Sequence, residues 1–457
     1  MAKGWGFALK VDEDELLKRA MKWKEISLKL HSFYKGKLTV IPKVPIRGIK
    51  DFSWTYTPGV AEPCNKIREN KDLSFEYTGR WNYVAIVSDG SRVLGLGNIG
   101  PEAGLPVMEG KALLFKYLGG VDAFPLVTKA NKADELIQFL KWIEPNFGGI
   151  NLEDIAKPKC FEVLEKGRKE LSIPLWHDDQ QGTATVVYAG LKNALKLVGK
   201  KLSEIKIAFI GFGAANKKTA EILMLAGAKP ENMYIADSKG ILGPHRRDVI
   251  NTYKEWWALN TNPDGRVGGI ENAVKGVDVI IAMSRPGPGI VKKEHIKMMN
   301  DDPIVFALAN PIPEIWPWEA KEAGAKIVAT GRSDFPNQIN NSLSFPAIFR
   351  GVLDVRARTI TDEMCIAAGD AIAEFAERRG ISEDYIIPKM DEWELYPYEA
   401  ATVAVKAIEL GLARVKTTWK EEYERAKEII RTSIEMLNLL MKHSFIKPIP
   451  EDLAKLF

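Results

Sequence analysis

The sequence predicts an α/β protein with an N-terminal α/β catalytic domain, a doubly wound Rossmann-type nucleotide-binding domain and a C-terminal helical segment, at 1–180, 181–400 and 401–457. Three observations lead to this prediction. Short apolar runs alternate with segments of helical periodicity between residues 81 and 330, as in parallel sheets covered by helices. A glycine turn, Gly211-Phe-Gly213, stands between one such run and the next helix. With 457 residues, the chain is also too long for one ordinary core.

Composition limits the class of protein. The chain carries 64 Lys and Arg against 60 Asp and Glu, a net charge of +4, so neither a nucleic-acid nor a membrane partner is expected. Cys64, Cys160 and Cys365 are far apart and form no CxxC pair, which indicates a reducing compartment and argues against a zinc site. The sequence opens without a signal-like apolar stretch and contains no long apolar run. We therefore expect a soluble cytoplasmic protein.

The N-terminal part has the pattern of an α/β unit. Residues 12–33 have the spacing of an amphipathic helix. Residues 81–87, 121–127 and 149–155 have the apolar character of strands, and a helix is expected over 132–144. The loops of such a unit can carry a site.

Two of these loops present polar side chains. Tyr56 stands just before the Pro58-Gly59 turn, so we expect it on a loop, with a packing role as the alternative. Arg92 follows the first strand in a glycine-rich turn, where a guanidinium can hold a carboxylate through two parallel hydrogen bonds. The alternative for Arg92 is a hairpin with a surface arginine.

A lysine lies in an apolar helix that the sequence predicts from Pro106 onward. Lys111 begins in largely buried surroundings, and burial lowers the pKa of a lysine, which makes it usable as a general base. Lys116, one turn later, is a second candidate for the same role. A surface lysine with a buried stem is the alternative for both.

Two pairs of acidic residues follow apolar segments. Glu153 and Asp154 form one pair, and Asp178 and Asp179 follow a predicted strand over 171–176. Adjacent carboxylates repel each other and are costly to bury unpaired, so the two pairs suggest a cation. All-oxygen ligands suit Mg²⁺ or Mn²⁺. The alternative is that an Asp of the second pair caps the helix that starts near Gly182.

The glycine turn has the context of a dinucleotide site. A strand precedes it, a helix follows, and the next strand ends in Asp237, 24 residues after Gly213, where an acid can bond ribose hydroxyls. The expected cofactor-binding residues are Gly211, Gly213, Ala214, Ala215, Asn216, Asp237, Ser238, Lys239 and Asn310. Asp237 favours NAD, whereas Lys239 and the basic cluster at 245–247 could neutralise the 2′-phosphate of NADP.

Further predicted strands end in polar residues. They cover 277–283, 304–309 and 327–329, and the second of them leads into Asn310. Ligands bind at the carboxyl ends of strands in such sheets. The amides of Asn310 and Asn341 can hold a carboxylate, although structural asparagine turns are an alternative.

Together these groups suit an oxidative decarboxylation. A metal polarises the oxygen of a 2-hydroxy acid, a base removes the hydroxyl proton and hydride passes to nicotinamide. A β-carboxylate can then leave as CO₂, and an acid protonates the remaining carbon.

Several long motifs also resemble those of malic enzymes, specifically the compact prokaryotic form. They run from Tyr56 to Cys64, from Ser88 to Gly100, from Asn151 to Ile155 and from His177 to Thr183. The resemblance spans roughly residues 15–415 in the same order. Two features depart from it, namely Asn216 in place of a small residue and the tail after about Lys416.

The resemblance implies conversion of L-malate to pyruvate and CO₂ with NAD or NADP and Mg²⁺ or Mn²⁺. It also implies a homodimer or higher homo-oligomer, sometimes with active-site groups shared between subunits. Its implied residue roles are metal ligands at Glu153, Asp154 and Asp179, with Asp178 beside them, Lys111 as base, Tyr56 as acid, and Arg92, Asn310 and Asn341 as malate ligands. The alternatives are a malolactic-type lyase that retains its nucleotide, a metal-independent Rossmann dehydrogenase of another substrate and a non-catalytic nucleotide sensor.

Overall fold

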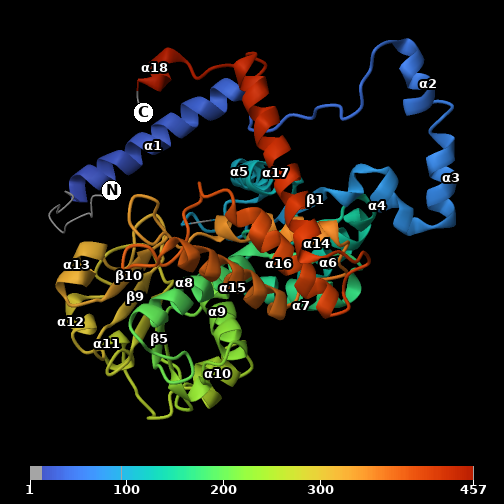
Figure 1. The fold of residues 1–457 in the computed structure, drawn as a ribbon. Coiled ribbons are helices and arrows are strands. Elements are labelled where there is room, and N and C mark those ends of the chain that lie inside the picture. Colours follow the sequence, from blue (N-terminus) through green and yellow to red (C-terminus); the bar gives the residue numbers. More distant parts are fainter. Residues whose placement is uncertain (1–12, 94, 456–457) are drawn as a thin grey trace. The chain divides into compact units, whose positions relative to one another are not determined.

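The computed structural model describes residues 13–93 and 95–455 and confirms the α/β class, with one parallel sheet and one mostly parallel sheet (Figure 1). The chain forms two compact units. One comprises residues 41–433, and the other joins residues 1–40 to residues 434–457.

The smaller unit is helical in its described part. It contains α1 (Glu13–Tyr34), the C-terminal end of α17 (Trp419–Lys442) and α18 (Glu451–Ala454). The Tyr34 hydroxyl donates a hydrogen bond of 2.8 Å to the Lys447 carbonyl, which ties the end of α1 to the C-terminal segment. The helix expected over residues 12–33 is confirmed, apart from Asp12, which lies outside the described residues.

The first sheet of the larger unit has four parallel strands in the order β2-β1-β3-β4. Its strands are β1 (Tyr83–Ser88), β2 (Asp122–Val127), β3 (Gly149–Leu152) and β4 (Leu175–His177). The helices of this region are α2 (Phe52–Thr55), α3 (Ala61–Glu69), α4 (Ser74–Tyr77), α5 (Pro101–Gly119), α6 (Ala133–Ile143) and α7 (Lys159–Glu170). Since all four strands are parallel, their carboxyl ends lie at one edge, where ligands bind in such sheets.

Three predicted boundaries in this region are wrong. The strand expected over 171–176 covers only Leu175–His177, because α7 extends to Glu170 and Pro174 cannot donate a hydrogen bond. The strand expected over 149–155 ends at Leu152, because the chain turns at Asp154, whose φ is +57°. Helix α5 begins at Pro101 and contains Pro106, which was expected to start it.

The second sheet has six strands in the order β10-β9-β8-β5-β6-β7, with only β7 antiparallel. The strands are β5 (Ile207–Ile210), β6 (Met233–Asp237), β7 (Gly240–Ile241), β8 (Val279–Ala282), β9 (Ile304–Ala307) and β10 (Ile327–Thr330). Its helices are α8 (Thr183–Leu197), α9 (Ala214–Leu225), α10 (Glu255–Asn260), α11 (Ile270–Ala273), α12 (Lys293–Ile296) and α13 (Pro317–Glu322). Strand β6 lies on one side of β5 and β8 lies on the other, so the order in which the chain adds strands reverses at β5. A nucleotide site usually lies at such a position in a sheet of this kind.

The chain from Phe345 is mostly helical, as predicted. Helices α14 (Phe345–Asp354), α15 (Asp362–Arg379) and α16 (Leu395–Glu409) precede α17. Arg350 of α14 is fully buried, donates to both carboxylate oxygens of Asp354 and donates 2.6 Å to Asn82, which precedes β1. This network ties α14 to the first sheet, although α14 follows the second sheet in sequence.

Within the described residues, none of the helices has the length and apolar character needed to cross a membrane. The two sheets lie in residues 83–177 and 207–330. The domain limits 1–180, 181–400 and 401–457 remain predictions.

Candidate active site

The two acidic pairs lie at the carboxyl ends of neighbouring strands. Strands β3 and β4 pair in parallel with Leu152 opposite His177, so Glu153-Asp154 and Asp178-Asp179 leave the sheet side by side. Asp178 and Asp179 begin a π-helical turn, Asp178–Gly182, that leads into α8. The predicted position of the second pair at the mouth of a strand is therefore confirmed.

Three of these carboxylates form one cluster. Glu153, Asp154 and Asp179 each place an oxygen within 4.8 Å of the others. The backbone N–H of Asp154 donates 2.9 Å to Asp179, which holds the two pairs together. Burial raises the pKa of Glu153 well above its ordinary value, and the charges of Asp178, Asp179 and Asp154 raise it further, against the opposing effect of Lys111. Glu153 and Asp154 are buried and Asp179 is half-buried, and such crowded oxygen ligands fit a hard dication such as Mg²⁺ or Mn²⁺.

Lys111 reaches this cluster from α5. Its side chain is only 9% exposed, and its ammonium lies 2.6 Å from Asp178 and 3.2 Å from Glu153. Asp178 is held on its other oxygen by the indole N–H of Trp176, at 3.0 Å. Lys111 is thus fixed in position between the second acidic pair and a carboxylate of the cluster.

The charge state of Lys111 differs from the expectation. Burial by itself lowers the pKa of Lys111, as predicted, but the carboxylates of Asp178 and Glu153 outweigh it and leave the pKa above the ordinary lysine value. The prediction of a lowered pKa for Lys111 is therefore wrong for the protein without a bound metal. It took account of burial but not of the carboxylates of Asp178 and Glu153. Lys116, the second candidate, is one-third exposed and pairs with Asp122 at 2.8 Å, away from the cluster.

Two expected malate ligands, Arg92 and Asn341, lie near the acidic cluster, and the backbone of Asn310 lies near the turn that carries Arg92. The backbone N–H of Arg92 donates 2.9 Å to the Asp154 carbonyl. A Cβ placed on Gly182 would lie 2.0 Å from an Asp178 oxygen and 3.2 Å from the Asn341 Cβ, so Asn341 stands next to the acidic turn. A Cβ on Gly95, in the turn that carries Arg92, would lie 3.7 Å from the Asn310 carbonyl oxygen.

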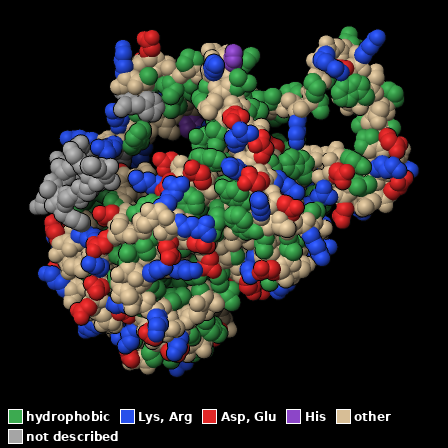
Figure 2. All heavy atoms as spheres, in the orientation of Figure 1, with side chains coloured by type: hydrophobic (Ala, Val, Ile, Leu, Met, Phe, Trp, Pro, Cys, Tyr) green, Lys and Arg blue, Asp and Glu red, His purple; other side chains and the backbone are tan. Residues whose placement is uncertain are grey.

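Tyr56 is not brought to this cluster. It ends α2, is 68% exposed, and is not among the residues that line the large pocket next to the cluster. The segment around Tyr56 also exposes many large apolar side chains (Figure 2). The exposed members are Ile41, Val44, Ile46, Ile49, Phe52, Trp54 and Val60.

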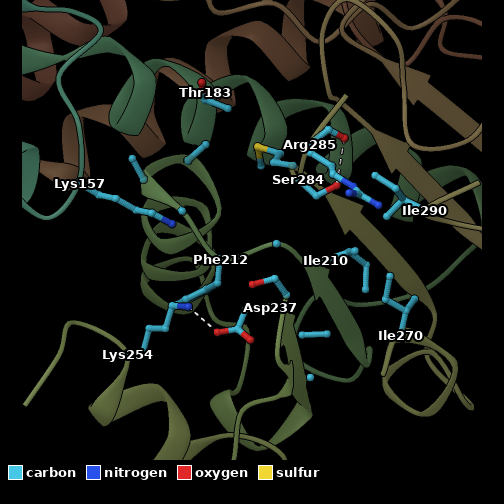
Figure 3. Close-up of a pocket in the computed structure, with 18 of the residues that line it drawn as sticks. Lys157, Thr183, Ile210, Phe212, Asp237, Lys254, Ile270, Ser284, Arg285 and Ile290 are labelled. Atoms are coloured by element: carbon cyan, nitrogen blue, oxygen red, sulfur yellow. Dashed lines mark hydrogen bonds and ion pairs between the residues drawn. The ribbon is translucent and has the colours of Figure 1, made fainter. Parts of the chain in front are cut away.

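That pocket of about 1230 Å³ lies at the carboxyl ends of β5, β6 and β8 (Figure 3). It extends to Asp154 and Asp179 of the acidic cluster. The predicted site residues that line it are Arg92, Asp154, Asp179, Gly211, Gly213, Ala214, Ala215, Asp237 and Ser238. The N-terminus of α9 faces this space and offers free backbone N–H groups to an anion. One pocket therefore joins the dinucleotide fingerprint to two of the clustered carboxylates.

The third position of the glycine motif has a structural role. Asn216 is fully buried, and its amide donates 2.6 Å to the Gly211 carbonyl and 3.2 Å to the Ile210 carbonyl. The Asn216 side chain thus holds the glycine turn to the end of β5. It is not among the residues that line the pocket.

Sequence reasoning missed basic residues that line this pocket, among them Lys157, Lys254 and Lys292. Figure 3 shows Lys157 beside the start of α9 and Lys254 bonded to Asp237. Lys157 stands three residues after Asp154, at the mouth of β3, and this position was a usable signal. Lys254 belongs to no motif and reaches Asp237 only through folding of the 240–254 segment.

Comparison with known proteins identifies two domains. Residues 35–132 match the family model "Malic enzyme, N-terminal domain", and residues 180–409 match "Malic enzyme, NAD binding domain".

Individual relatives extend this match over most of the chain. A bifunctional malic/malolactic enzyme of Bacillus subtilis is 48% identical over 409 residues, which cover 90% of this chain and 99% of the relative. An NAD-dependent malic enzyme of Geobacillus stearothermophilus is 48% identical over 380 residues, 83% of this chain and 78% of the relative. Other relatives are named NADP-dependent malic enzymes.

A solved structure shares the fold over almost the whole chain. The malic enzyme of Entamoeba histolytica superposes with a TM-score of 0.94 at 48% identity, covering 98% of this chain and 95% of that one. The matched domains, the long relatives and this structural agreement show that the chain belongs to the malic enzyme family.

Proposed function

We propose that the protein catalyses the oxidative decarboxylation of L-malate to pyruvate and CO₂, with a nicotinamide dinucleotide as electron acceptor and a divalent metal as cofactor. One observation carries this proposal. The pocket that contains the dinucleotide fingerprint is also lined by Asp154 and Asp179, so a hydroxy acid held at the carboxylates would stand next to the dinucleotide. Membership of the malic enzyme family supports the same reaction.

Glu153, Asp154 and Asp179 would hold the metal. Their clustered oxygens, and the φ of +57° that turns Asp154 back toward Asp179, support this assignment. When bound, the metal polarises the oxygen on C2 of malate, and the dinucleotide accepts hydride from that carbon.

Lys111 would act as the base on the C2 hydroxyl. A dication bound to the three carboxylates would offset the negative charge that raises the pKa of Lys111, and this pKa would then fall toward the range of a general base. Asp178 accepts a hydrogen bond of 2.6 Å from the Lys111 ammonium and would keep it directed at the substrate.

Arg92, Asn310 and Asn341 would bind the carboxylates of malate. Arg92 and Asn341 lie next to acidic residues of the cluster, and the backbone of Asn310 approaches the turn that carries Arg92, which supports this role. Arg92 is the charged member, and it can hold a carboxylate through two parallel hydrogen bonds.

Tyr56 would protonate C3 after CO₂ has left, in the active site of a second subunit. Its exposed position argues against a role within its own subunit, and the exposed apolar residues around it have the character of a surface that another protein covers. We therefore propose a homodimer in which the segment around α2 packs on the partner.

The reaction is tested by following absorbance at 340 nm with L-malate, Mn²⁺ and either NAD or NADP, together with an assay of pyruvate. We expect malate-dependent reduction with one pyruvate for each dinucleotide reduced. The alternative is a malolactic reaction, in which malate is converted to lactate, and it is favoured by the relative named malic/malolactic enzyme. Loss of malate with formation of lactate and no net reduction would favour it and contradict our proposal.

Replacing Lys111 tests the base. We expect Lys111→Ala to lower kcat by at least about 10²-fold, because a positioned base contributes about 10²- to 10⁴-fold, while the dinucleotide still binds. Lys116→Ala is the matched control on the same helix and should retain turnover, since Lys116 pairs with Asp122. Equal turnover in the two variants would remove Lys111 as the base.

Replacing Asp179 tests the metal site. We expect Asp179→Asn to weaken Mn²⁺ binding, measured by calorimetry, by more than the roughly 10- to 100-fold loss typical when a partner of a metal ligand is removed. The control is Asp134→Asn, an exposed residue paired with Lys166 at 3.3 Å. Unchanged Mn²⁺ affinity in Asp179→Asn would contradict the ligand assignment.

Mixing two inactive variants tests whether Tyr56 acts across subunits. If Tyr56→Phe and Lys111→Ala chains are unfolded together and refolded, half of the dimers are mixed, and each mixed dimer contains one complete site. We expect about a quarter of the wild-type activity to return, as a two-fold symmetric dimer requires. Sites complete within each subunit would give no recovery, and that outcome would refute the shared site.

A further inference from the structure

A buried carboxylate outside the acidic cluster joins the ends of two strands of the second sheet. Glu314 is fully buried. One of its oxygens accepts from the Ser284 backbone N–H at 2.7 Å and from the Ser284 hydroxyl at 3.0 Å. The other accepts from the Ala309 backbone N–H at 3.0 Å. Strands β8 and β9 are neighbours, and Ser284 and Ala309 each stand two residues after the end of one of them.

The carboxylate serves main-chain groups where the regular pairing of the sheet has ended. Burial raises the pKa of Glu314, and the hydrogen bonds from Ser284 and Ala309 oppose this rise. A buried carboxylate is costly unless donors compensate it, and here three donors do so. The same bonds fix the main chain at both strand ends, because a buried backbone N–H without a partner would also cost free energy. Glu314 therefore holds the two strand ends at one separation.

The first of these strand ends begins a segment, residues 284–291, that forms part of the wall of the large pocket. Figure 3 shows Ser284 and Arg285 at this wall. The members of this wall segment that line the pocket are Ser284, Arg285, Pro288, Gly289 and Ile290. Ser284 packs on the glycine turn, since a Cβ placed on Gly211 would lie only 2.9 Å from the Ser284 Cα. A shift of Ser284 would therefore alter the space beside the dinucleotide fingerprint.

Two more hydrogen bonds tie the wall segment to the residues around the buried carboxylate. The Gly287 N–H donates 3.2 Å to the Ile312 carbonyl. The Val291 N–H donates 3.1 Å to the Glu314 carbonyl. The wall segment is therefore held at its beginning, its middle and its end, and a movement of the chain near Glu314 would displace it.

The second strand end leads into a proposed malate ligand. Asn310 follows Ala309 directly. The turn that carries Arg92 reaches both strand ends, since a Cβ on Gly95 would lie 3.7 Å from the Asn310 carbonyl oxygen and 3.8 Å from the Pro286 side chain. The buried carboxylate therefore links the wall of the dinucleotide pocket to a residue of the proposed malate site.

We propose that Glu314 is a positioning residue that sets the distance between the dinucleotide and the hydroxy acid. It acts through Ser284 on the wall of the pocket and through Ala309 on Asn310, and it is not itself among the residues that line the pocket. This inference rests on the proposed function, because it takes Asn310 as a malate ligand. Hydride transfer requires close approach of the two reacting carbons, and a displacement of about 1 Å can lower the rate by about 10²-fold.

Binding of each ligand alone tests this role without turnover. Glu314→Gln keeps the size of the side chain but places an amide donor against the N–H of Ser284 or of Ala309. Calorimetry would measure L-malate on the Mn²⁺-loaded protein and, separately, NADH or NADPH, whichever the wild type binds more tightly. We expect each affinity to fall by at least about fivefold, as the loss of a hydrogen bond to a charged group allows. Unchanged affinity for either ligand would overturn the proposal.

A double-mutant cycle separates positioning from a general disturbance of the site. Asn310→Ala removes the side chain through which Glu314 acts on malate. We expect Glu314→Gln to weaken L-malate binding by less than about twofold in the Asn310→Ala background, because the effects of coupled residues do not add. A merely structural effect would weaken L-malate binding by the same factor in both backgrounds, and that result would refute positioning through Asn310.

A control and a milder variant complete the binding test. Glu322→Gln removes a carboxylate at the end of α13, where the side chain is half exposed and pairs with Lys293, and it should leave both affinities unchanged. Melting temperatures would verify folding. If Glu314→Gln does not fold, Ser284→Ala removes one donor, leaves both backbone bonds and should weaken L-malate binding by about two- to threefold. Unchanged L-malate affinity in Ser284→Ala would then contradict the proposal.

Turnover separates this inference from the proposed function. We expect Glu314→Gln to lower kcat for malate-dependent reduction by at least about tenfold. Its Mn²⁺ affinity should stay within about twofold of the wild type, because the three clustered carboxylates follow strands of the first sheet. Wild-type kcat in Glu314→Gln would overturn the inference and leave the function standing. Absence of reduction by the wild type would overturn the function, and the two binding measurements would still decide the role of Glu314.

Discussion

Crowded carboxylates at the ends of β3 and β4 impose the constraint on which the rest of the site depends. Glu153, Asp154 and Asp179 lie within 4.8 Å of one another, and Asp178 adds a fourth acid beside them. Such charges repel one another and lose solvation when buried, so they require cations. The protein supplies one through Lys111. The remaining acidic charge is what a dication would neutralise, so the lysine and the metal balance the same cluster.

This arrangement explains why parts of the chain far apart in sequence have to meet. Lys111 comes from α5, the acids from two strand ends and Asn341 from the loop before α14. Arg350 fixes α14 against Asn82 and so joins the helices after the second sheet to the first sheet. A shift of any one of these helices or strand ends would separate the charged groups of a buried cluster, and an unpaired buried charge is costly.

The sequence was most informative where one local pattern determines the structure. The alternation of apolar runs and helices predicted both sheets, and the acidic pairs and the glycine turn lie at strand ends as expected. Strand limits near residues 152 and 175 were missed, because a φ of +57° at Asp154 and the end of α7 depend on tertiary contacts. The pKa of Lys111 was missed for a similar reason, since burial is visible in a sequence and the two facing carboxylates are not. The motif around Tyr56 suggested a role for it, but a motif does not predict that the side chain lies exposed and away from the acidic cluster.

Asp237 shows how side chains distant in sequence can occupy a residue that a motif assigns to a ligand. A strand that ends in an acid after a glycine turn predicts a ribose contact, because a free carboxylate accepts hydrogen bonds from two hydroxyls. That prediction assumes that the carboxylate is free. Here Arg246 and Lys254 come from the segment after β7, and with the Lys239 backbone they fill the acceptor sites of Asp237. The acid therefore orders the basic side chains around it, and a ribose hydroxyl could bond to it only by displacing one of these donors.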